Sequence, residues 1–265
     1  MKRISIIGCG TIGSEVAKAL DRNEIHMNLT SIYDIDKDRA IHLKNGLRNI
    51  SPKICDNTED AISNADIVFE STQIDAVKTI AEECFELGKD LFVMSVGSLI
   101  VYPEILDNAK KSNCKVFIPS GAIIGLDGIS ASKIAGIESV TLKTTKPLKS
   151  LMNSAGLDEF LKSRNKRIED ITEAETIFEG NVKQAVPLFP RNINVSAALA
   201  ISGIGPEKTL VKIVADPFGD KNIHEIQCVS KAGVTYTRSE NVPHPENPKT
   251  SYLAILSAIA KLKDM

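Results

Sequence analysis

The 265-residue sequence has no tryptophan, only 5% aromatic residues and four histidines. Its 32 Lys+Arg and 34 Asp+Glu nearly cancel, so the chain offers no basic surface for nucleic acid. It has no apolar run long enough to cross a bilayer, so we expect no membrane contact. Its five cysteines form no CxxC pair, which predicts reduced thiols and no bound metal.

The length and the 43% hydrophobic content suit two closely connected globular lobes. The first expected strand begins within two residues of Met1, which leaves no room for a signal peptide. Together with the unpaired cysteines, this start predicts a cytoplasmic protein.

The most informative pattern lies at the start of the chain, where an apolar run at residues 3–7 meets a glycine-spaced turn and then a helical pattern. The turn reads Gly8-Cys9-Gly10-Thr11-Ile12-Gly13. In such a turn the first glycine permits the bend, the second admits a pyrophosphate, and the third lets helix pack on strand. We therefore predict that a dinucleotide binds here, at Gly8, Gly10, Thr11, Ile12 and Gly13.

An acid stands at the distance that this motif requires. Asp34 closes a second apolar run, residues 29–33. A carboxylate there accepts hydrogen bonds from the adenosine ribose and favours NAD over NADP. Lys37 and Arg39 follow closely and are cations that tolerate a 2′-phosphate, so either coenzyme stays open.

Residues 1–121 alternate between strand and helix patterns, which predicts a Rossmann-type, doubly wound parallel α/β sheet as the dinucleotide-binding domain. The expected helices are 37–45, 75–87 and 103–112, and the expected later strands are 65–70, 90–95 and 115–119. Ligands bind beyond the carboxyl ends of such strands. Ser71-Thr72 and Ser95-Val96-Gly97 are therefore expected near the cofactor.

Residues 122–244 follow a different pattern and predict a second α+β domain with an open mixed sheet, for substrate and oligomerisation. The expected strands are 139–145, 209–216, 224–229 and 233–237, with a helix of small residues at 195–201. Residues 158–176, rich in charge of both signs, predict a solvated helix or a mobile surface segment. The end of the chain, residues 245–265, predicts a helix that packs back on the first domain.

Nicotinamide chemistry needs a protein group that transfers a proton, and histidine is the commonest one. His26 and His42 are expected at the surface or in structural roles, and His244, among prolines, in an exposed loop. His224 opens a strand after a turn, and by position alone a structural role is favoured over a catalytic one.

Two further segments allow two interpretations each. Residues 120–125 offer glycine-permitted backbone N–H groups near the cofactor, or form a simple interdomain turn. Residues 189–194 group Arg191 with Asn192 and Asn194. The amides suit a carboxamide ring and the cation a carboxylate, or Asn194 caps the next helix.

Several blocks together resemble the L-aspartate dehydrogenase family over the whole length of the chain. These blocks are residues 119–127, 189–195, 215–217, 222–226 and 247–251. The resemblance implies NAD- or NADP-dependent oxidation of L-aspartate to iminoaspartate. This product hydrolyses to oxaloacetate and ammonia or feeds quinolinate and pyridine nucleotide biosynthesis.

The same resemblance implies roles for individual residues. His224 would be the active-site histidine, and Ala122 with Asn194 or Asn192 would contact the nicotinamide end of the cofactor. The family usually has an arginine where Thr145 stands here. The cations expected to bind the substrate carboxylates are Arg191, Lys146 and Lys249.

The resemblance also implies a homo-oligomer, with a dimer favoured. Two alternatives remain from the sequence. One is another two-domain NAD(P)-dependent oxidoreductase acting on an amino or imino acid, similar to dihydrodipicolinate reductase or homoserine dehydrogenase. The other is a nucleotide-sensing protein without turnover.

Overall fold

The structure, a computed structural model, describes residues 1–189 and 193–265, without the side chains of Pro248 and Lys249. It divides into two compact units. Unit 1 comprises Met1–Pro119 and Ile255–Met265, and unit 2 comprises Ser120–Ala254. The sequence predicts that the chain returns to the first domain at residue 245, whereas unit 2 continues to Ala254. Residue 245 lies inside a β-hairpin of unit 2.

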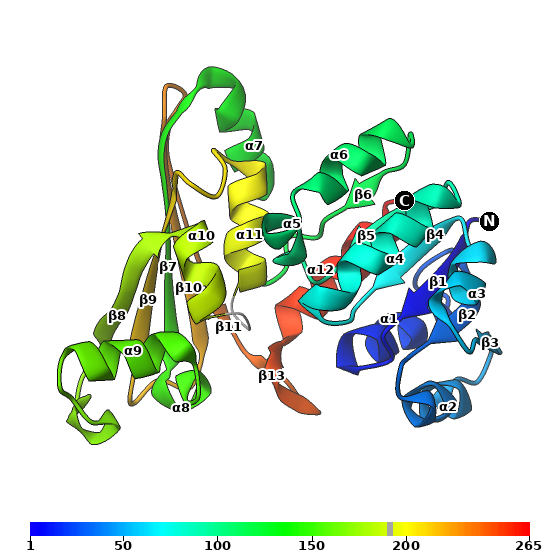
Figure 1. Ribbon diagram of the computed structural model, residues 1–265, viewed down its shortest axis with the longest axis horizontal. Coiled ribbons are helices and arrows are strands. Elements are labelled where there is room, and N and C mark those ends of the chain that lie inside the picture. The colour runs from blue at the N-terminus through cyan, green and yellow to red at the C-terminus, as the bar shows by residue number, and fades with distance from the viewer. Residues whose placement is uncertain (190–192) are drawn as a thin grey trace. The chain divides into compact units, whose positions relative to one another are not determined.

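Unit 1 is built on six parallel strands in the order β3-β2-β1-β4-β5-β6 (Figure 1). The strands are β1 (Arg3–Ile7), β2 (Asn28–Tyr33), β3 (Lys53–Ile54), β4 (Ile67–Glu70), β5 (Asp90–Val93) and β6 (Val116–Phe117). In β1, β4 and β5 nearly all inner positions are apolar and buried, as expected where helices cover a parallel sheet. The order reverses between β1 and β4, so the loops after these strands meet at one edge.

The helices of unit 1 bury their apolar stripes against this sheet. They are α1 (Thr11–Asp21), α2 (Lys37–Gly46), α3 (Thr58–Ser63), α4 (Ile74–Glu86), α5 (Ser98–Val101), α6 (Glu104–Lys111) and α12 (Tyr252–Lys263). Val16 and Leu20 of α1 share one core with Ala258 and Leu262 of α12. The last helix of the chain is thus part of the core around the first strand.

Unit 2 carries a mixed sheet of five strands in the order β11-β10-β7-β9-β8. The strands are β7 (Ile137–Pro147), β8 (Glu175–Asn181), β9 (Thr209–Asp216), β10 (Asn222–Ser230) and β11 (Gly233–Asn241). β7 and β9 run parallel and the other neighbours are antiparallel. A small hairpin of β12 (Pro243–His244) and β13 (Asn247–Ser251) follows. The expected fold class is therefore confirmed in both units.

One face of this sheet is covered by helices and the other is bare (Figure 1). The helices of unit 2 are α7 (Leu126–Ala135), α8 (Leu148–Leu151), α9 (Ala155–Ser163), α10 (Val182–Leu188) and α11 (Ile193–Ser202), with a 3₁₀ turn at Ile168–Asp170. Under α7 and α11, Val140, Leu142 and Ile226 form the core with Ile129 and Leu199. The alternation of the strands thus assigns each residue to the core or to the bare face.

The expectation for residues 158–176 is wrong at both ends. Helix α9 begins at Ala155, where Ser154 caps it, and edge strand β8 starts at Glu175. Only Ile177 is buried in β8, so its apolar signal is weak. Tertiary packing compensates for this weak signal, because the Phe178 ring packs edge-on against the Phe189 ring, with the ring centroids 5.6 Å apart.

No helix among the described residues is long and apolar enough to span a membrane.

Candidate functional site

The three glycines after β1 differ in how much space surrounds them. Gly8 has φ +99°, and a Cβ there would lie 2.5 Å from the Ser71 carbonyl oxygen. A Cβ on Gly13 would lie 2.0 Å from the Gly8 oxygen, so only glycine lets α1 pack this closely on β1. Around Gly10, the N-cap of α1, a Cβ would meet no atom within 4 Å. An open side beside a helix N-terminus is typical of a turn that receives a pyrophosphate.

Thr11 and Ile12 form the first turn of α1, directly after Gly10. Helix N-termini present N–H groups toward an anion and carry the positive end of the helix dipole. The five residues predicted to bind the dinucleotide thus occupy the turn after β1 and the first turn of α1.

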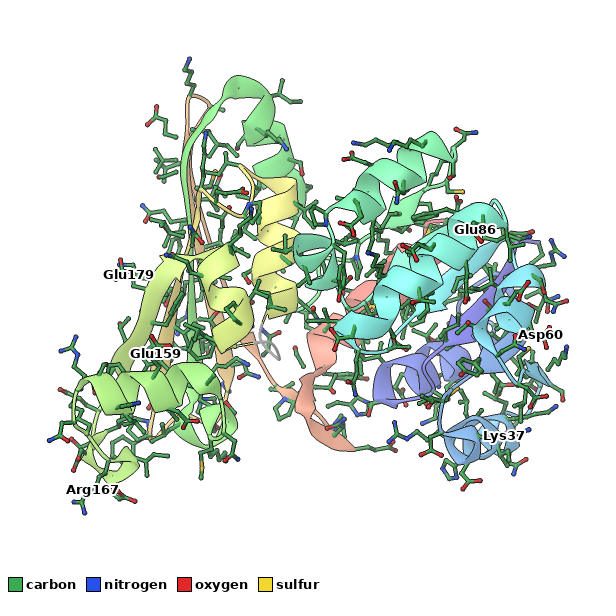
Figure 2. All side chains as sticks on the ribbon, viewed as in Figure 1. Lys37, Asp60, Glu86, Glu159, Arg167 and Glu179 are labelled. Atoms are coloured by element: carbon green, nitrogen blue, oxygen red, sulfur yellow. The ribbon has the colours of Figure 1, made fainter. Side chains whose placement is uncertain are left out.

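Asp34 follows β2 and is tied to the glycine turn. One carboxylate oxygen accepts the Cys9 N–H at 2.7 Å, and the other accepts the Asp36 N–H at 2.9 Å. The two cations downstream have acidic partners, Lys37 with Asp56 at 2.6 Å and Arg39 with Asp36 at 3.2 Å. Figure 2 shows Lys37 at the surface of unit 1.

In unit 2, His224 lies directly opposite Thr144 on neighbouring antiparallel strands. The His224 Nδ1 and Thr144 Oγ1 atoms are 3.0 Å apart, and His224 is only 5% exposed. Lys146, two residues after Thr144, lies on the same face. Sequence reasoning missed Thr144, although strand alternation with Lys146 and Leu142 was a signal for it.

Glu225 points to the opposite face, as the strand pattern predicts. Its carboxylate accepts from Lys143 at 3.1 Å and Arg238 at 3.0 Å on the bare side of the sheet. It therefore belongs to a surface network of charges and is separated from His224 by the sheet.

The pKa values of His224 and Lys146 are both lower than those of ordinary histidine and lysine side chains. Burial, and then the charge of Lys146, lower the pKa of His224 to about 3. Burial also lowers the pKa of Lys146 to about 8. His224 is therefore neutral at pH 7 with one ring nitrogen carrying a lone pair, and Lys146 is a cation close to its titration range.

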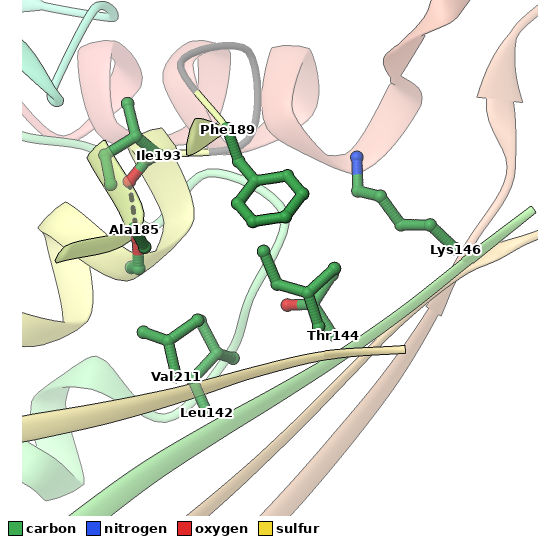
Figure 3. A pocket seen from close by; sticks show the side chains of 9 residues that line it. Leu142, Thr144, Lys146, Ala185, Phe189, Ile193 and Val211 are labelled. Carbon is green, nitrogen blue, oxygen red and sulfur yellow. Dashed lines mark hydrogen bonds between the residues drawn. The ribbon is translucent and has the colours of Figure 1, made fainter. Parts of the chain in front are cut away.

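A small cavity of about 10 Å³ lies against Thr144 and Lys146, with room for about one water molecule (Figure 3). Its walls are Leu142, Thr144, Lys146, Ala185, Phe189, Ile193, Ser196, Val211 and Ile213. In Figure 3, Lys146 and the Phe189 ring lie on the side of the sheet that carries Thr144. A larger hollow of about 400 Å³ lies between α9 and β8 and contains none of the residues predicted at the site.

The structure describes only some of the other residues predicted at the site. Ala122 is buried, and its carbonyl accepts the Ser239 hydroxyl at 3.0 Å and the Asn241 amide at 2.9 Å. Asn194 lies inside the first turn of α11, so the alternative that it caps this helix is wrong. Arg191 and Asn192 lie outside the described residues, as does the side chain of Lys249 on β13.

The other three histidines differ in burial, and one of them differs from its expected position. His26 and His42 are exposed. The expectation for His244 is wrong, because the residue is buried against Tyr252, with the rings 5.4 Å apart. Its Nδ1 accepts the Glu246 N–H at 3.3 Å, which stabilises the β12–β13 turn. His244 therefore has a structural role in the hairpin.

Among the described residues, no three His, Cys, Asp or Glu side chains cluster in a way that holds a metal ion. All five cysteines are free and buried. Burial, with the neighbouring Asp34 charge, raises the pKa of the Cys9 thiol to about 12. The thiol in the glycine turn is thus protonated and fills space.

These observations define the class. A parallel sheet with a glycine cradle after β1 and an acid after β2 is a dinucleotide-binding unit. Unit 2 adds a neutral buried histidine, which can accept a proton, and a lysine cation near it. The chain has the architecture of a pyridine-nucleotide-dependent oxidoreductase.

The comparisons with known proteins give the family. Residues 127–265 match the family "Aspartate dehydrogenase, C-terminal", and residues 8–119 match "Homoserine dehydrogenase, NAD binding domain". The chain is 41% identical to an L-aspartate dehydrogenase of Methanosarcina mazei and 42% identical to one of Nitrosopumilus maritimus, over 99% of this chain and 96% of each relative. The chain belongs to the aspartate dehydrogenase family, and the predicted resemblance is confirmed.

Solved structures agree with this assignment. The aspartate dehydrogenase of Thermotoga maritima aligns over 100% of this chain and 96% of its own, with a TM-score of 0.73 and 28% identity. A homoserine dehydrogenase of Thiobacillus denitrificans shares the fold over 99% of this chain and 72% of its own, at a TM-score of 0.64 and 15% identity. At that identity the second likeness concerns the fold alone.

The neutral state of His224 predicts a pH dependence of stability. An ordinary histidine titrates near 6.5, so between pH 6.5 and about 3 the unfolded chain binds more protons than the folded one. The free energy of unfolding therefore decreases as the pH falls through this window. In urea unfolding, His224→Asn should flatten this slope between pH 6.5 and 4.5 by up to about 1.4 kcal/mol per pH unit.

The matched control is His42→Asn, which changes an exposed histidine of unit 1 and should keep the wild-type slope. If His224→Asn also keeps the wild-type slope, then His224 is not held neutral in the folded chain.

Proposed function

We propose that this chain is an NAD(P)-dependent L-aspartate dehydrogenase that oxidises L-aspartate to iminoaspartate. The imine then hydrolyses to oxaloacetate and ammonia or serves quinolinate and pyridine nucleotide biosynthesis. The observation that carries the proposal is the buried pair of His224 and Thr144, with Lys146 beside it, in a chain of this family.

The cofactor is held by unit 1. Gly8, Gly10 and Gly13 with the start of α1 cradle the pyrophosphate, and Asp34 accepts the ribose hydroxyls. The bound nicotinamide supplies the hydride acceptor. Ala122 and Asn194 or Asn192 are the residues proposed for its carboxamide end.

His224 is the proposed base. The substrate ammonium must lose a proton before its nitrogen lone pair can assist departure of the Cα hydride. We assign the Nδ1–H of His224 as donor to Thr144 Oγ1, which leaves the Nε2 lone pair free to accept that proton. The same nitrogen also suits activation of the water that attacks the imine.

Lys146 links substrate binding to this proton transfer. Its charge lowers the pKa of His224 in the chain without ligand. A substrate carboxylate paired with Lys146 compensates that charge, so the pKa of His224 rises when the amino acid arrives. Arg191, Lys249 and the backbone of residues 121–122 are the other groups proposed for the two carboxylates.

We propose NAD as the preferred coenzyme. Asp34 places a carboxylate where the 2′-phosphate of NADP would lie, and its neighbour Ile35 is 93% exposed and uncharged. Lys37 and Arg39 are already paired with acids, so neither offsets that repulsion without losing its partner.

We propose a homodimer that forms through the bare face of the unit 2 sheet. On strand β11 this face exposes Val234 (65%) and Tyr236 (60%), and on β9 it exposes Leu210. Large apolar side chains on one open sheet face are typical of an interface.

We also propose that the protein acts in the cytoplasm. The five cysteines are free and buried, which suits a reducing compartment.

The activity has a direct test. With NAD present, L-aspartate should produce absorbance of the reduced cofactor, whereas homoserine and other amino acids should not. His224→Ala should lower kcat by about a hundredfold or more, the scale of general acid–base assistance, with little change in the Kd of NAD. His26→Ala, an exposed histidine, is the control. Near-normal turnover of His224→Ala would remove this residue from the mechanism, and no response to aspartate would remove the proposed substrate.

Coenzyme choice is tested at Asp34. Asn retains one oxygen for the Cys9 N–H but loses the charge that binds ribose and repels phosphate. Asp34→Asn should raise the KM for NAD by about tenfold or more and leave that for NADP unchanged or lower. Asp107→Asn, which changes an exposed acid on helix α6 of the same unit, should change neither by more than about threefold. Equal losses for both coenzymes at Asp34 would contradict the ribose contact.

The interface is tested by light scattering. The wild type should have the mass of two chains, and Val234→Arg should dissociate it, because a buried unpaired charge is costly at an interface. Ile134→Arg is the control, since Ile134 is 91% exposed on helix α7. A wild-type monomer, or a Val234→Arg variant that stays dimeric, would refute the proposed face.

A further inference from the structure

A buried carboxylate ends the strand next to the glycine turn. Glu70 is the last residue of β4 and is 0% exposed. Its Oε1 accepts the N–H and hydroxyl of Thr72, at 2.6 and 2.8 Å, and the hydroxyl of Ser95 at 2.9 Å. Its Oε2 accepts the N–H groups of Met94 at 3.2 Å and Ser95 at 3.1 Å. One side chain therefore fixes the turns after β4 and β5.

The donors around Glu70 suit an ionised carboxylate. Burial raises the pKa of Glu70, and the hydrogen bonds from Ser95 and Thr72 oppose this. Three of the five donors are backbone N–H groups, which cannot reverse to accept a proton from a carboxylic acid. Among the described residues, no lysine or arginine pairs with Glu70, so its negative charge stays uncompensated by a cation.

The position of Glu70 follows from the strand order. Asp34 lies at the end of β2, where the ribose binds, and the pyrophosphate cradle follows β1. A dinucleotide that continues across the sheet edge next reaches the ends of β4 and β5. Ser71, beside Glu70, donates its hydroxyl to the Gly8 carbonyl at 2.8 Å, so cradle and turns form one connected edge. The nicotinamide half of a dinucleotide bound in this way would therefore lie toward Glu70.

We propose that Glu70 is a positioning residue whose fixed negative charge also makes unit 1 favour the oxidised form of the coenzyme. The oxidised nicotinamide ring carries a positive charge that the reduced ring lacks. A buried anion stabilises that ring more than its reduced form, because few water dipoles screen it. The inference rests on the pyridine nucleotide binding proposed above and concerns the balance between its two redox states.

The test compares two dissociation constants in Glu70→Gln. NAD+ and NADH are titrated separately into the folded variant and the wild type by calorimetry. Removal of the charge should raise the Kd of NAD+ about three- to tenfold more than that of NADH. If both constants rise by the same factor or neither changes, Glu70 acts by shape alone or not at all, and the proposal is wrong.

Two further variants separate charge from shape. Ser95→Ala removes one donor but keeps the carboxylate, so it should weaken both forms equally and leave their ratio within about twofold. Asp66→Asn removes a carboxylate at the opposite, amino-terminal end of β4, where it pairs with Arg3 on the surface. It should leave the ratio unchanged.

A second route covers a Glu70→Gln variant that does not fold. In the double variant Thr72→Val and Ser95→Ala, two of the five donors are lost, so the pKa of Glu70 rises further. As the pH falls, the preference for NAD+ should therefore decline at a higher pH in the double variant than in the wild type. A flat ratio in both proteins refutes the charge effect. Failure of the wild type to bind either nucleotide would instead refute the proposed function.

Discussion

The arrangement of unit 1 depends on the close approach of three backbone segments at the carboxyl edge of its sheet. The Gly8 carbonyl, the start of α1 and the turn after β4 come so near that neither Gly8 nor Gly13 has space for a Cβ. This contact fixes where α1 begins, and the helix start then fixes where an anion binds. Asp34 joins the same arrangement through the Cys9 N–H. The geometry of the glycine turn is therefore a consequence of backbone packing more than of side-chain chemistry.

Much of this architecture was predictable because its signals are local. The glycine spacing, the apolar strands and Gly88, whose φ of +65° ends helix α4, each act over a few residues. The strand alternation also placed Glu225 on the face opposite His224. Local sequence signals are therefore sufficient to predict the fold class and the positions of most strands.

The failures have a different physical origin. Strand β8 has only one buried side chain, so its sequence shows no strand pattern. It forms because it pairs with β9, which is distant in the sequence. His244 lies among prolines, a composition typical of exposed loops, yet Tyr252 covers it. Thr144 and Glu70 gain their importance from partners 80 and 24 or 25 residues away. Strand register across the sheet, rather than any motif, brings such residues together.

Unit 2 is inserted between the body of unit 1 and its last helix. Ala258 and Leu262 fill the core beside Ile4 and Ile6, and the Lys2 ammonium donates to the carbonyl of Met265. Until α12 is synthesised, the core of unit 1 therefore lacks one of its helices and keeps an apolar surface uncovered. The whole of unit 2 is synthesised before residues 255–265, which complete unit 1. A chain truncated by one helix would lose the closing element of the unit where the chain began.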